Sequence, residues 1–335
     1  GTLGGYENFL VAVVLGGIIQ LIFGLLKAGI IGYYFPSSVI KGMLTGIGII
    51  IILKQIPHFF GYDPNPERDF AFFQVDGENT FSEIINALNH IAPGSALIGV
   101  IGLGILLLWD KVLSKKGKVF QLVQGPLVAV IVGIIFFVAT KSHETLGIDQ
   151  SHLVSVPIPD DAASFFGQFS LPNFSAITNP EIWIVAFTIA LRNSANIQSG
   201  GRSKMSAIIH GFFLLISVIL IPRLLNMIPL SVLAAILFIV GFKLAKPSLF
   251  KKMYNLGWKQ SIPFYVTVLG IVFIDLLYGI GLGLTVGIVV ILIKSFQNSH
   301  FLHIEDKSNG KHKIKMTLAE EVTFFNKGAI LKELD

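Results

Sequence analysis

Long apolar runs are the feature that most constrains how this chain folds. They recur along most of its length, and only short polar or proline-containing segments separate many of them. A run of about 20 apolar residues can cross a bilayer as a helix, because a helix satisfies its own backbone hydrogen bonds. Only 13% of the residues are charged, which is about half the usual fraction in a soluble domain. The pattern predicts an all-α polytopic membrane protein.

Most of these apolar runs are long enough to span a bilayer, or nearly so, whereas Ile182–Leu191 is too short. The runs cover Phe9–Tyr34, Val39–Ile56, Ala96–Trp109, Pro126–Ala139, Ile182–Leu191, Ile208–Leu220, Pro229–Leu244, Phe264–Tyr278 and Ile280–Ile293. Prolines stop the first two, at Pro36 and Pro57, and little more than Gly279 separates the last two.

Basic residues are distributed unevenly among the connecting segments. They mark three of them, at Lys111, Lys115, Lys116 and Lys118; at Arg202 and Lys204; and at Lys246, Lys251, Lys252 and Lys259. Residues 142–190 contain no Lys or Arg. Because basic loops stay in the cytoplasm, the three marked segments are predicted to be cytoplasmic and Asp63 and Asp160 to lie outside. The positive net charge thus reflects topology, and no nucleic-acid partner is predicted.

Several kinds of chemistry have no support in the sequence. The chain has no cysteine, which excludes disulfides, thiolate metal sites and cysteine nucleophiles. No nucleophile elbow, P-loop or dinucleotide fingerprint is present, so we predict neither an enzyme nor an ATP-driven pump. Asp160 and Asp161 are interpreted as a solvated pair, and His58 and His90 are too isolated to indicate zinc.

Two further polar residues and one outer segment have structural interpretations. His210 is interpreted as a packing or interfacial residue rather than a proton relay, and Asp275 as a helix cap or ion-pair partner. Thr80 with Glu83 three residues later predicts a capping box. The helix that follows would carry one apolar face and lie along the membrane surface; that face consists of Phe81, Ile84, Ile85 and Leu88.

The composition changes beyond Ser299. Residues 300–335 are polar and charged, and Lys313-Ile314-Lys315-Met316 alternates as a strand would. We therefore divide the chain into a membrane domain, residues 1–299, and the start of a cytoplasmic domain, residues 300–335, which is too short to fold alone.

Five segments resemble, in the same order, parts of the sulfate permease (SulP) family. They are YFPSSVIKG at 34–42, SANIQSGGRSK at 194–204, IPLSVLAAIL at 228–237, DLLYG at 275–279 and LAEEVTFFNK at 318–327. Each is weakly specific alone, but together they follow the order of the family and are distributed along most of the chain. The last segment is similar to the opening strand of a STAS domain.

The resemblance implies an inverted-repeat (7+7) fold of the uracil-permease type, with a core and a gate domain, followed by an α/β STAS domain. It also implies a secondary transporter, by symport, of a small inorganic anion of the sulfate, bicarbonate or chloride class. A sodium ion or proton would be the coupling ion, and no other cofactor is implied. The protein would form a homodimer in the cell (inner) membrane with its tail in the cytoplasm.

The anion-binding residues implied by the resemblance are Arg192, Asn193 and Ser194. Arg192 lies ten residues before Arg202 and nine before Gly201, which is the position of the family's tenth-helix arginine. An intramembrane arginine is costly and by default indicates function. The alternative is an arginine at the cytoplasmic boundary, and for the two neighbours simple helix packing.

The sequence also departs from the family pattern. Gly1–Tyr6 aligns just before the fourth helix of the family, and near Ala190-Leu191 the pattern passes from the eighth helix to the middle of the tenth. We expect the first three helices and a segment near 190–191 to be missing from this chain, while all six gate helices are retained. A non-transporting scaffold that recruits partners through the STAS-like tail, and a nucleobase permease, therefore stay open as alternatives.

Overall fold

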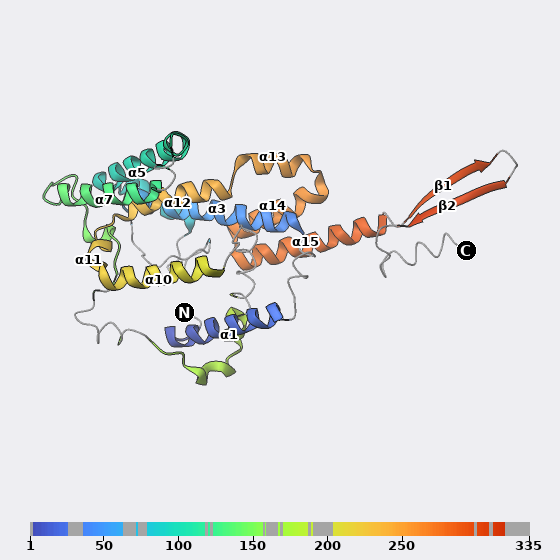
Figure 1. Cartoon of the computed structure of the whole chain (residues 1–335), viewed down its shortest axis with the longest axis horizontal. Helices are drawn as coiled ribbons and strands as arrows, with labels where there is room; N and C mark the ends of the chain where they lie inside the picture. Colours follow the sequence, from blue (N-terminus) through green and yellow to red (C-terminus); the bar gives the residue numbers. More distant parts are fainter. Residues whose placement is uncertain are drawn as a thin grey trace.

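A computed structural model describes most of the membrane domain and a hairpin after it. The described residues are 3–25, 36–62, 72, 79–117, 120, 123–156, 158, 167, 170–186, 189, 204–297, 300–307 and 311–318. The long helices are α1 (Tyr6–Leu25), α3 (Ser37–Phe60), α5 (Pro93–Lys111), α7 (Gly125–Thr140), α10 (Lys204–Leu220), α12 (Leu230–Leu244), α14 (Trp258–Phe273) and α15 (Leu276–Gln297) (Figure 1). The short elements are α4 (Thr80–Asn89), α11 (Pro222–Leu225), α13 (Pro247–Asn255), the 3-10 turns Leu113–Lys115, Gln150–His152 and Phe174–Thr178, and the strands β1 (His300–Lys307) and β2 (Lys311–Leu318).

Four helical segments of the described part are long and apolar enough to cross a membrane. They are Ser37–Phe60, Pro93–Lys115, Leu230–Asn255 and Leu276–Ile293, and shorter apolar helices occupy Tyr6–Ile22, Gly125–Thr140 and Gly211–Leu220. Seven of the nine apolar runs predicted from the sequence overlap these segments, and an eighth, Phe264–Tyr278, overlaps α14. Two predicted boundaries are wrong. Pro57 lies inside α3, which ends at Phe60 and is capped by Gly61 with a positive φ of 75°. The last two spans separate at Ile274 and Asp275 rather than at Gly279, which lies inside α15.

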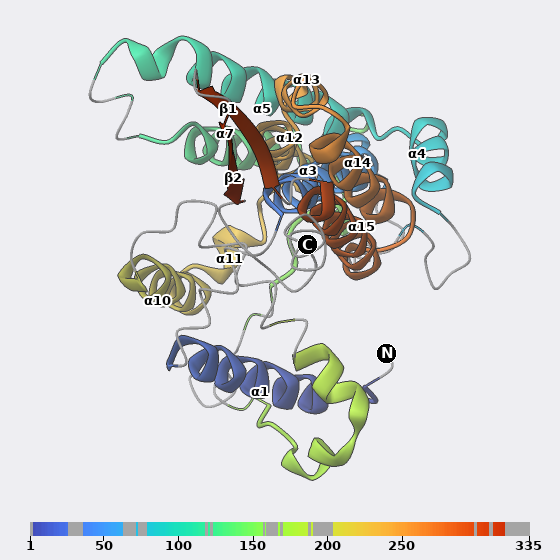
Figure 2. The ribbon, with the colours of Figure 1, turned by 90° about the vertical axis from the view of Figure 1, so that its right-hand side faces the viewer.

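Six of the long helices form one packed body, visible in Figures 1 and 2, in which the two halves of the chain repeat each other's contacts. The helix α3 of the first half contacts α14 of the second half. Correspondingly, α12 of the second half contacts α5 of the first half. Likewise α5 packs on α7 as α14 packs on α15, and α15 touches α3 as α7 touches α12. The helices α3, α5 and α7 therefore correspond to α12, α14 and α15. This exchange of contacts is what an inverted repeat produces.

The centre of this body is the crossing of α3 and α12, where two glycines face each other. A Cβ added to Gly48 would lie 2.6 Å from the Gly241 carbonyl oxygen, and a Cβ added to Gly241 would lie 2.7 Å from the Gly48 carbonyl oxygen. Only residues without side chains allow two helix backbones to approach so closely. Gly48 and Gly241 therefore fix the packing distance between the two halves.

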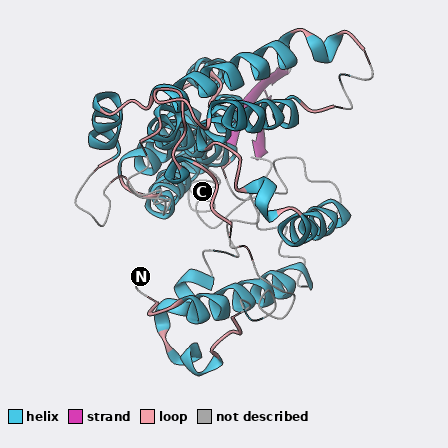
Figure 3. Ribbon diagram, turned by 90° about the vertical axis from the view of Figure 1, so that its left-hand side faces the viewer, coloured by secondary structure: helices cyan, strands magenta, loops and turns pink. Residues whose placement is uncertain are grey.

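The helix α1 belongs to a separate packed group, shown apart from the six-helix body in Figures 2 and 3. Its Val11, Ala12 and Leu15 form a buried cluster with Ile182 and Ala186. Residues 180–186 are helical. The six-helix body has its own two clusters, one around Val232 and one around Phe264. The described chain thus contains two packed groups with different buried cores.

The connection after α7 is hydrogen-bonded to the connection before α12. The side chain of Asn226 accepts a bond from the Val156 backbone nitrogen (2.6 Å) and donates one to the Val156 carbonyl (2.8 Å). The Val154 nitrogen also donates to the Ile228 carbonyl, and Leu153 forms a β-bridge with Pro229. Two connections that lie about 70 residues apart in sequence are therefore held side by side.

A β-hairpin follows the last helix. The strands β1 and β2 are antiparallel, with His300 opposite Leu318 and Lys307 opposite Lys311, and the hairpin projects beyond the end of α15 (Figure 1). The strand predicted at residues 313–316 is confirmed within β2. Residues 319–335, which include most of the STAS-like segment, lie outside the described residues.

Candidate functional site

The three predicted anion-binding residues, Arg192, Asn193 and Ser194, lie outside the described residues, so their assignment stays a prediction. The same holds for Asp63, Asp160 and Asp161. His210 lies within α10, but its side chain is outside the described part of the chain. What the structure describes is the segment that precedes these residues in sequence, together with the six-helix body.

The residues that precede the predicted anion site in sequence pack against α1. The Gln20 side chain donates a hydrogen bond to the carbonyl of Ile189 at 3.3 Å, and Ile189 is three residues before Arg192. One turn earlier on α1, a Cβ added to Gly16 would lie 3.0 Å from the Ala186 carbonyl and 3.1 Å from Ile189. The last described residues before the predicted site are thus packed closely on one face of α1, and Gln20 is a polar contact that the sequence alone did not indicate.

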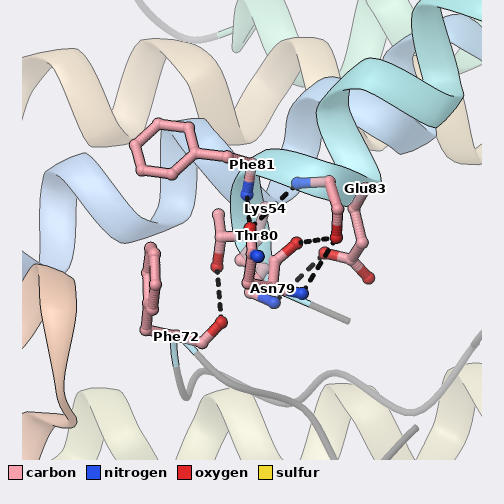
Figure 4. A network of polar contacts seen from close by, with 7 residues as sticks. Lys54, Phe72, Asn79, Thr80, Phe81 and Glu83 are labelled. Atoms are coloured by element: carbon pink, nitrogen blue, oxygen red, sulfur yellow. Dashed lines mark hydrogen bonds and ion pairs between the residues drawn. The ribbon is translucent and has the colours of Figure 1, made fainter. Parts of the chain in front are cut away.

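A charged pair that sequence reasoning missed lies in the six-helix body. Lys54 of α3 forms an ion pair with Glu83 of α4 at 3.2 Å, and the two side chains are 11% and 13% exposed (Figure 4). A cation inside a long apolar helix is an intramembrane charge and is therefore a functional hypothesis by default. Here the carboxylate neutralises it, so the pair is a structural contact that fastens α4 to α3.

The capping box predicted for this short helix is wrong in its residues. Asn79, not Thr80, is the N-cap: its side chain accepts hydrogen bonds from the backbone nitrogens of Phe81 and Ser82, both at 3.0 Å. The Ser82 hydroxyl returns the bond by accepting from the Asn79 nitrogen at 2.9 Å. Glu83 is then free of any capping role and reaches Lys54. The predicted apolar face is confirmed as outward-facing at Phe81, Ile85 and Leu88.

Phe72 connects this helix to the rest of the body. Its ring lies 5.7 Å from that of Phe81 and 5.6 Å from that of Phe273 at the end of α14. Its carbonyl accepts hydrogen bonds from the nitrogen of Thr80, at 3.1 Å, and from the hydroxyl of Thr80, at 3.5 Å (Figure 4). The helix α4 is therefore fixed at three points, through a charge, an aromatic ring and a backbone carbonyl.

A second ion pair joins the C-terminal ends of two other helices and provides a matched comparison. Lys243 of α12 contacts Asp110 of α5 at 2.9 Å, with side chains 53% and 54% exposed. Glu83→Gln leaves a nearly buried ammonium without its partner, and we expect it to lower the free energy of unfolding by about 1–3 kcal/mol. Asp110→Asn breaks an exposed pair and should cost less than about 1 kcal/mol.

Hydrogen exchange of the two variants, together with thermal unfolding, measures this difference. Glu83→Gln should raise exchange selectively in α4, because its anchor to α3 is lost, whereas Asp110→Asn should leave exchange near the wild-type level. Equal protection of α4 in both variants would show that the Lys54 pair does not hold the helix.

The remaining polar residues have structural roles. The Asp275 carboxylate accepts a hydrogen bond from the Leu277 nitrogen at 2.9 Å, which confirms the predicted cap, here at the start of α15. His90 stacks on Tyr62 with ring centroids 5.7 Å apart, and its Nδ1 lies 3.0 Å from the Asn86 carbonyl oxygen. Over the described ranges, no group of three His, Cys, Asp or Glu side chains could hold a metal ion.

Comparison with known families decides the identity of this arrangement. The sequence profile of the Sulfate permease family matches residues 4–192 and 184–267. The chain belongs to this family. The family assignment made from the five short segments is confirmed, and the nucleobase-permease alternative is therefore set aside.

Several curated proteins are similar to this member of the sulfate permease family over most of its length. The Bicarbonate transporter BicA of Picosynechococcus sp. is 25% identical over 351 residues, which cover 92% of this chain and 59% of that protein. The Putative sulfate transporter YvdB of Bacillus subtilis is 27% identical over 326 residues, 85% of this chain and 59% of that protein. The chain thus spans about three fifths of the length of these curated relatives.

The fold is similar to that of a solved transporter structure. The overall structure of SLC26A9 superposes with a TM-score of 0.63 at 16% identity, over 91% of this chain and 53% of that one. At this identity the likeness concerns the fold alone. Together with the family match and the apolar helices, it establishes an all-α multi-pass membrane protein with the transporter fold expected from the sequence.

Proposed function

We propose that the complete protein is a secondary transporter of a small inorganic anion, of the sulfate, bicarbonate or chloride class. It would work by alternating access, in which a core domain moves against a gate domain and exposes one binding site to each side in turn. The observation that carries this proposal is the six-helix body, in which α3, α5 and α7 repeat the contacts of α12, α14 and α15. We assign this six-helix body to the gate domain.

The separate packed group supports a division into gate and core. Its buried residues come from α1 and residues 182 and 186 and do not join either cluster of the frame. The predicted site at Arg192, Asn193 and Ser194 follows this group in sequence. A guanidinium there would offer an anion a fixed positive charge and a planar set of donors in a poorly solvated place.

The proposed domain division is residues 1–299 for the transporter and 300–335 for the start of a STAS domain. The end of α15 at Gln297 and the start of β1 at His300 support this boundary. The family match falls in two ranges that overlap at residues 184–192, which supports a missing segment near 190–191. A sodium ion or proton as coupling ion, symport, and a homodimer in the cell (inner) membrane belong to the same proposal.

Uptake into proteoliposomes tests the proposed function. The complete purified protein should take up labelled sulfate or bicarbonate faster than protein-free vesicles do, and an imposed sodium or proton gradient should stimulate the uptake if that ion is coupled. If sulfate, bicarbonate and chloride all fail to enter while the folded protein still binds cytoplasmic partners through its tail, the scaffold function is favoured instead.

The orientation in the membrane gives a separate prediction. In this cysteine-free chain, Lys115→Cys should react with an impermeant thiol reagent only after the cells are opened, because basic loops stay in the cytoplasm. Asp160→Cys should react in intact cells. Labelling of position 115 from outside intact cells would overturn the topology and place the tail after α15 outside the cytoplasm.

A further inference from the structure

The short helix α13 has two unlike faces. On one side Met253 is fully buried, and the Phe250 ring packs edge-to-face on Phe264 at 5.5 Å. The carbonyl of Phe264 in turn lies where a Cβ on Gly42 would meet it at 2.8 Å, in the second turn of α3. The helix α13 therefore packs against α14, and its Met253 belongs to the buried cluster around Phe264.

The other face of α13 is basic and aromatic. Lys251 and Lys252 are exposed. Also exposed are Tyr254 of the same helix (73%), Leu256 in the turn that follows (52%) and Trp258 at the start of α14 (50%). Lys259 places its ammonium 5.9 Å from the centre of the Trp258 ring. A helix whose lysines stand beside exposed Tyr, Trp and Leu has the composition of a segment that lies in a membrane interface.

No carboxylate competes for these lysines nearby in the sequence. Residues 230–273 contain five lysines and no acidic residue. Asp110, which does reach this end of the body, is already paired with Lys243. Within the described residues, neither Lys251 nor Lys252 forms an ion pair. Their charges are therefore available to an anionic partner outside the chain.

We propose that α13 and the turn after it form a binding surface for anionic phospholipid headgroups of the cytoplasmic leaflet. Lys251 and Lys252 contact the phosphates, while Tyr254, Leu256 and Trp258 enter the boundary between headgroups and acyl chains. Because α13 is packed on α14, bound lipid anchors the six-helix body rather than a mobile loop. The inference depends on the membrane orientation and not on which anion is transported.

Trp258 provides a built-in reporter of lipid contact. Every tryptophan of the protein except Trp258, including Trp109 and Trp183 of this chain, is replaced by Phe, so that Trp258 alone reports as a tryptophan. The protein is reconstituted into mixed bilayers in which either phosphatidylglycerol or phosphatidylcholine carries bromine near the headgroup, and the quenching of each mixture gives the relative affinity of the two lipids. Brominated phosphatidylglycerol should quench more strongly at equal mole fraction.

Two charge-neutralising variants separate this surface from a general effect of net charge. Lys251→Gln with Lys252→Gln should reduce the preference for phosphatidylglycerol by a factor of roughly five per lysine, or roughly 25-fold together at low salt. Lys141→Gln with Arg223→Gln removes two exposed charges that the predicted topology places on the outer side, and it should leave the preference unchanged. Raising the ionic strength should weaken the wild-type preference.

Three results would overturn the proposal. Equal quenching by the two brominated lipids in the wild-type protein would show no preference for anionic headgroups. An unchanged preference in the Lys251/Lys252 variant would place the lipid site elsewhere. A Trp258 that neither lipid quenches would show that protein, either a second copy of the chain or its cytoplasmic domain, covers α13.

Discussion

Replacing Gly279 by Ala is expected to lower the free energy of unfolding by about 3 kcal/mol or more, the upper range for overpacking a filled interface. A Cβ at this position would meet the backbone nitrogen and Cγ1 of Ile271 and would lie 2.7 Å from the Gly270 carbonyl carbon. Two of these three atoms belong to the main chain of α14, so a change of rotamer cannot relieve the contact. The helices α14 and α15 would have to move apart.

A glycine two residues away is the matched control. Gly281 is on the same helix, and a Cβ there would have nothing within 4 Å. Because alanine is the better helix former, Gly281→Ala should be neutral or stabilising by up to about 1 kcal/mol. Thermal unfolding of both variants in detergent compares them. Equal melting temperatures would show that the α14–α15 crossing is not as close as described.

Replacing Arg192 by Ala in the complete protein is expected to weaken anion binding by about 1.5–3 kcal/mol, the range for a charge-assisted hydrogen bond. This corresponds to a loss of roughly ten- to a hundredfold in affinity. Lys should rescue binding only in part, since it keeps the charge but loses the planar fork of donors. The half-saturation of uptake, normalised to folded protein, measures the effect.

Arg202→Ala is the control for this prediction, because it removes the same charge ten residues further on, within the predicted cytoplasmic turn. It should change insertion or expression without changing half-saturation. If Arg192→Ala behaves in the same way, Arg192 is a boundary residue, and the assignment of Arg192, Asn193 and Ser194 to the anion site is wrong.

The membrane helices were predictable because lipid imposes a simple rule on them. Apolar length and basic connections predicted α5, α7 and α12 to within a few residues. The boundaries that failed depended on local geometry. Pro57 falls in the last turn of α3, where it removes one backbone hydrogen bond but does not end the helix before Phe60. Gly279 was read as a break, although its lack of a side chain allows the close contact with α14.

The polar contacts were less predictable, since they depend on which residues meet in three dimensions. A Thr-x-x-Glu pattern predicted a cap at Thr80, but the adjacent Asn79 is an equally good cap and is the one used. Glu83 instead forms an ion pair with Lys54, 29 residues away in sequence. The pairing of Asn226 with Val156 spans 70 residues and leaves no periodic signal. Similarly, α13 was read only as part of a basic connecting segment, because its nine residues are too few to span a membrane.

The predicted anion site came from resemblance and not from periodicity or spacing. Family segments on both sides of residues 192–194 supplied the alignment, and the structure adds the contact of Gln20 with Ile189 just before them. Nothing in the apolar pattern distinguishes a functional arginine from a boundary arginine, because both occur where an apolar run meets a basic turn. That distinction requires a measurement of binding.

Counterflow of an anion through the complete protein tests alternating access most directly. Proteoliposomes are loaded with unlabelled sulfate or bicarbonate, the membrane potential is held at zero, and entry of the same labelled anion is followed. A site that faces one side at a time should return faster when it is loaded, so internal anion should accelerate entry of the label, and Arg192→Ala should shift the dependence on anion concentration. Entry that is independent of internal anion, or no entry at all, would contradict alternating-access transport by this protein.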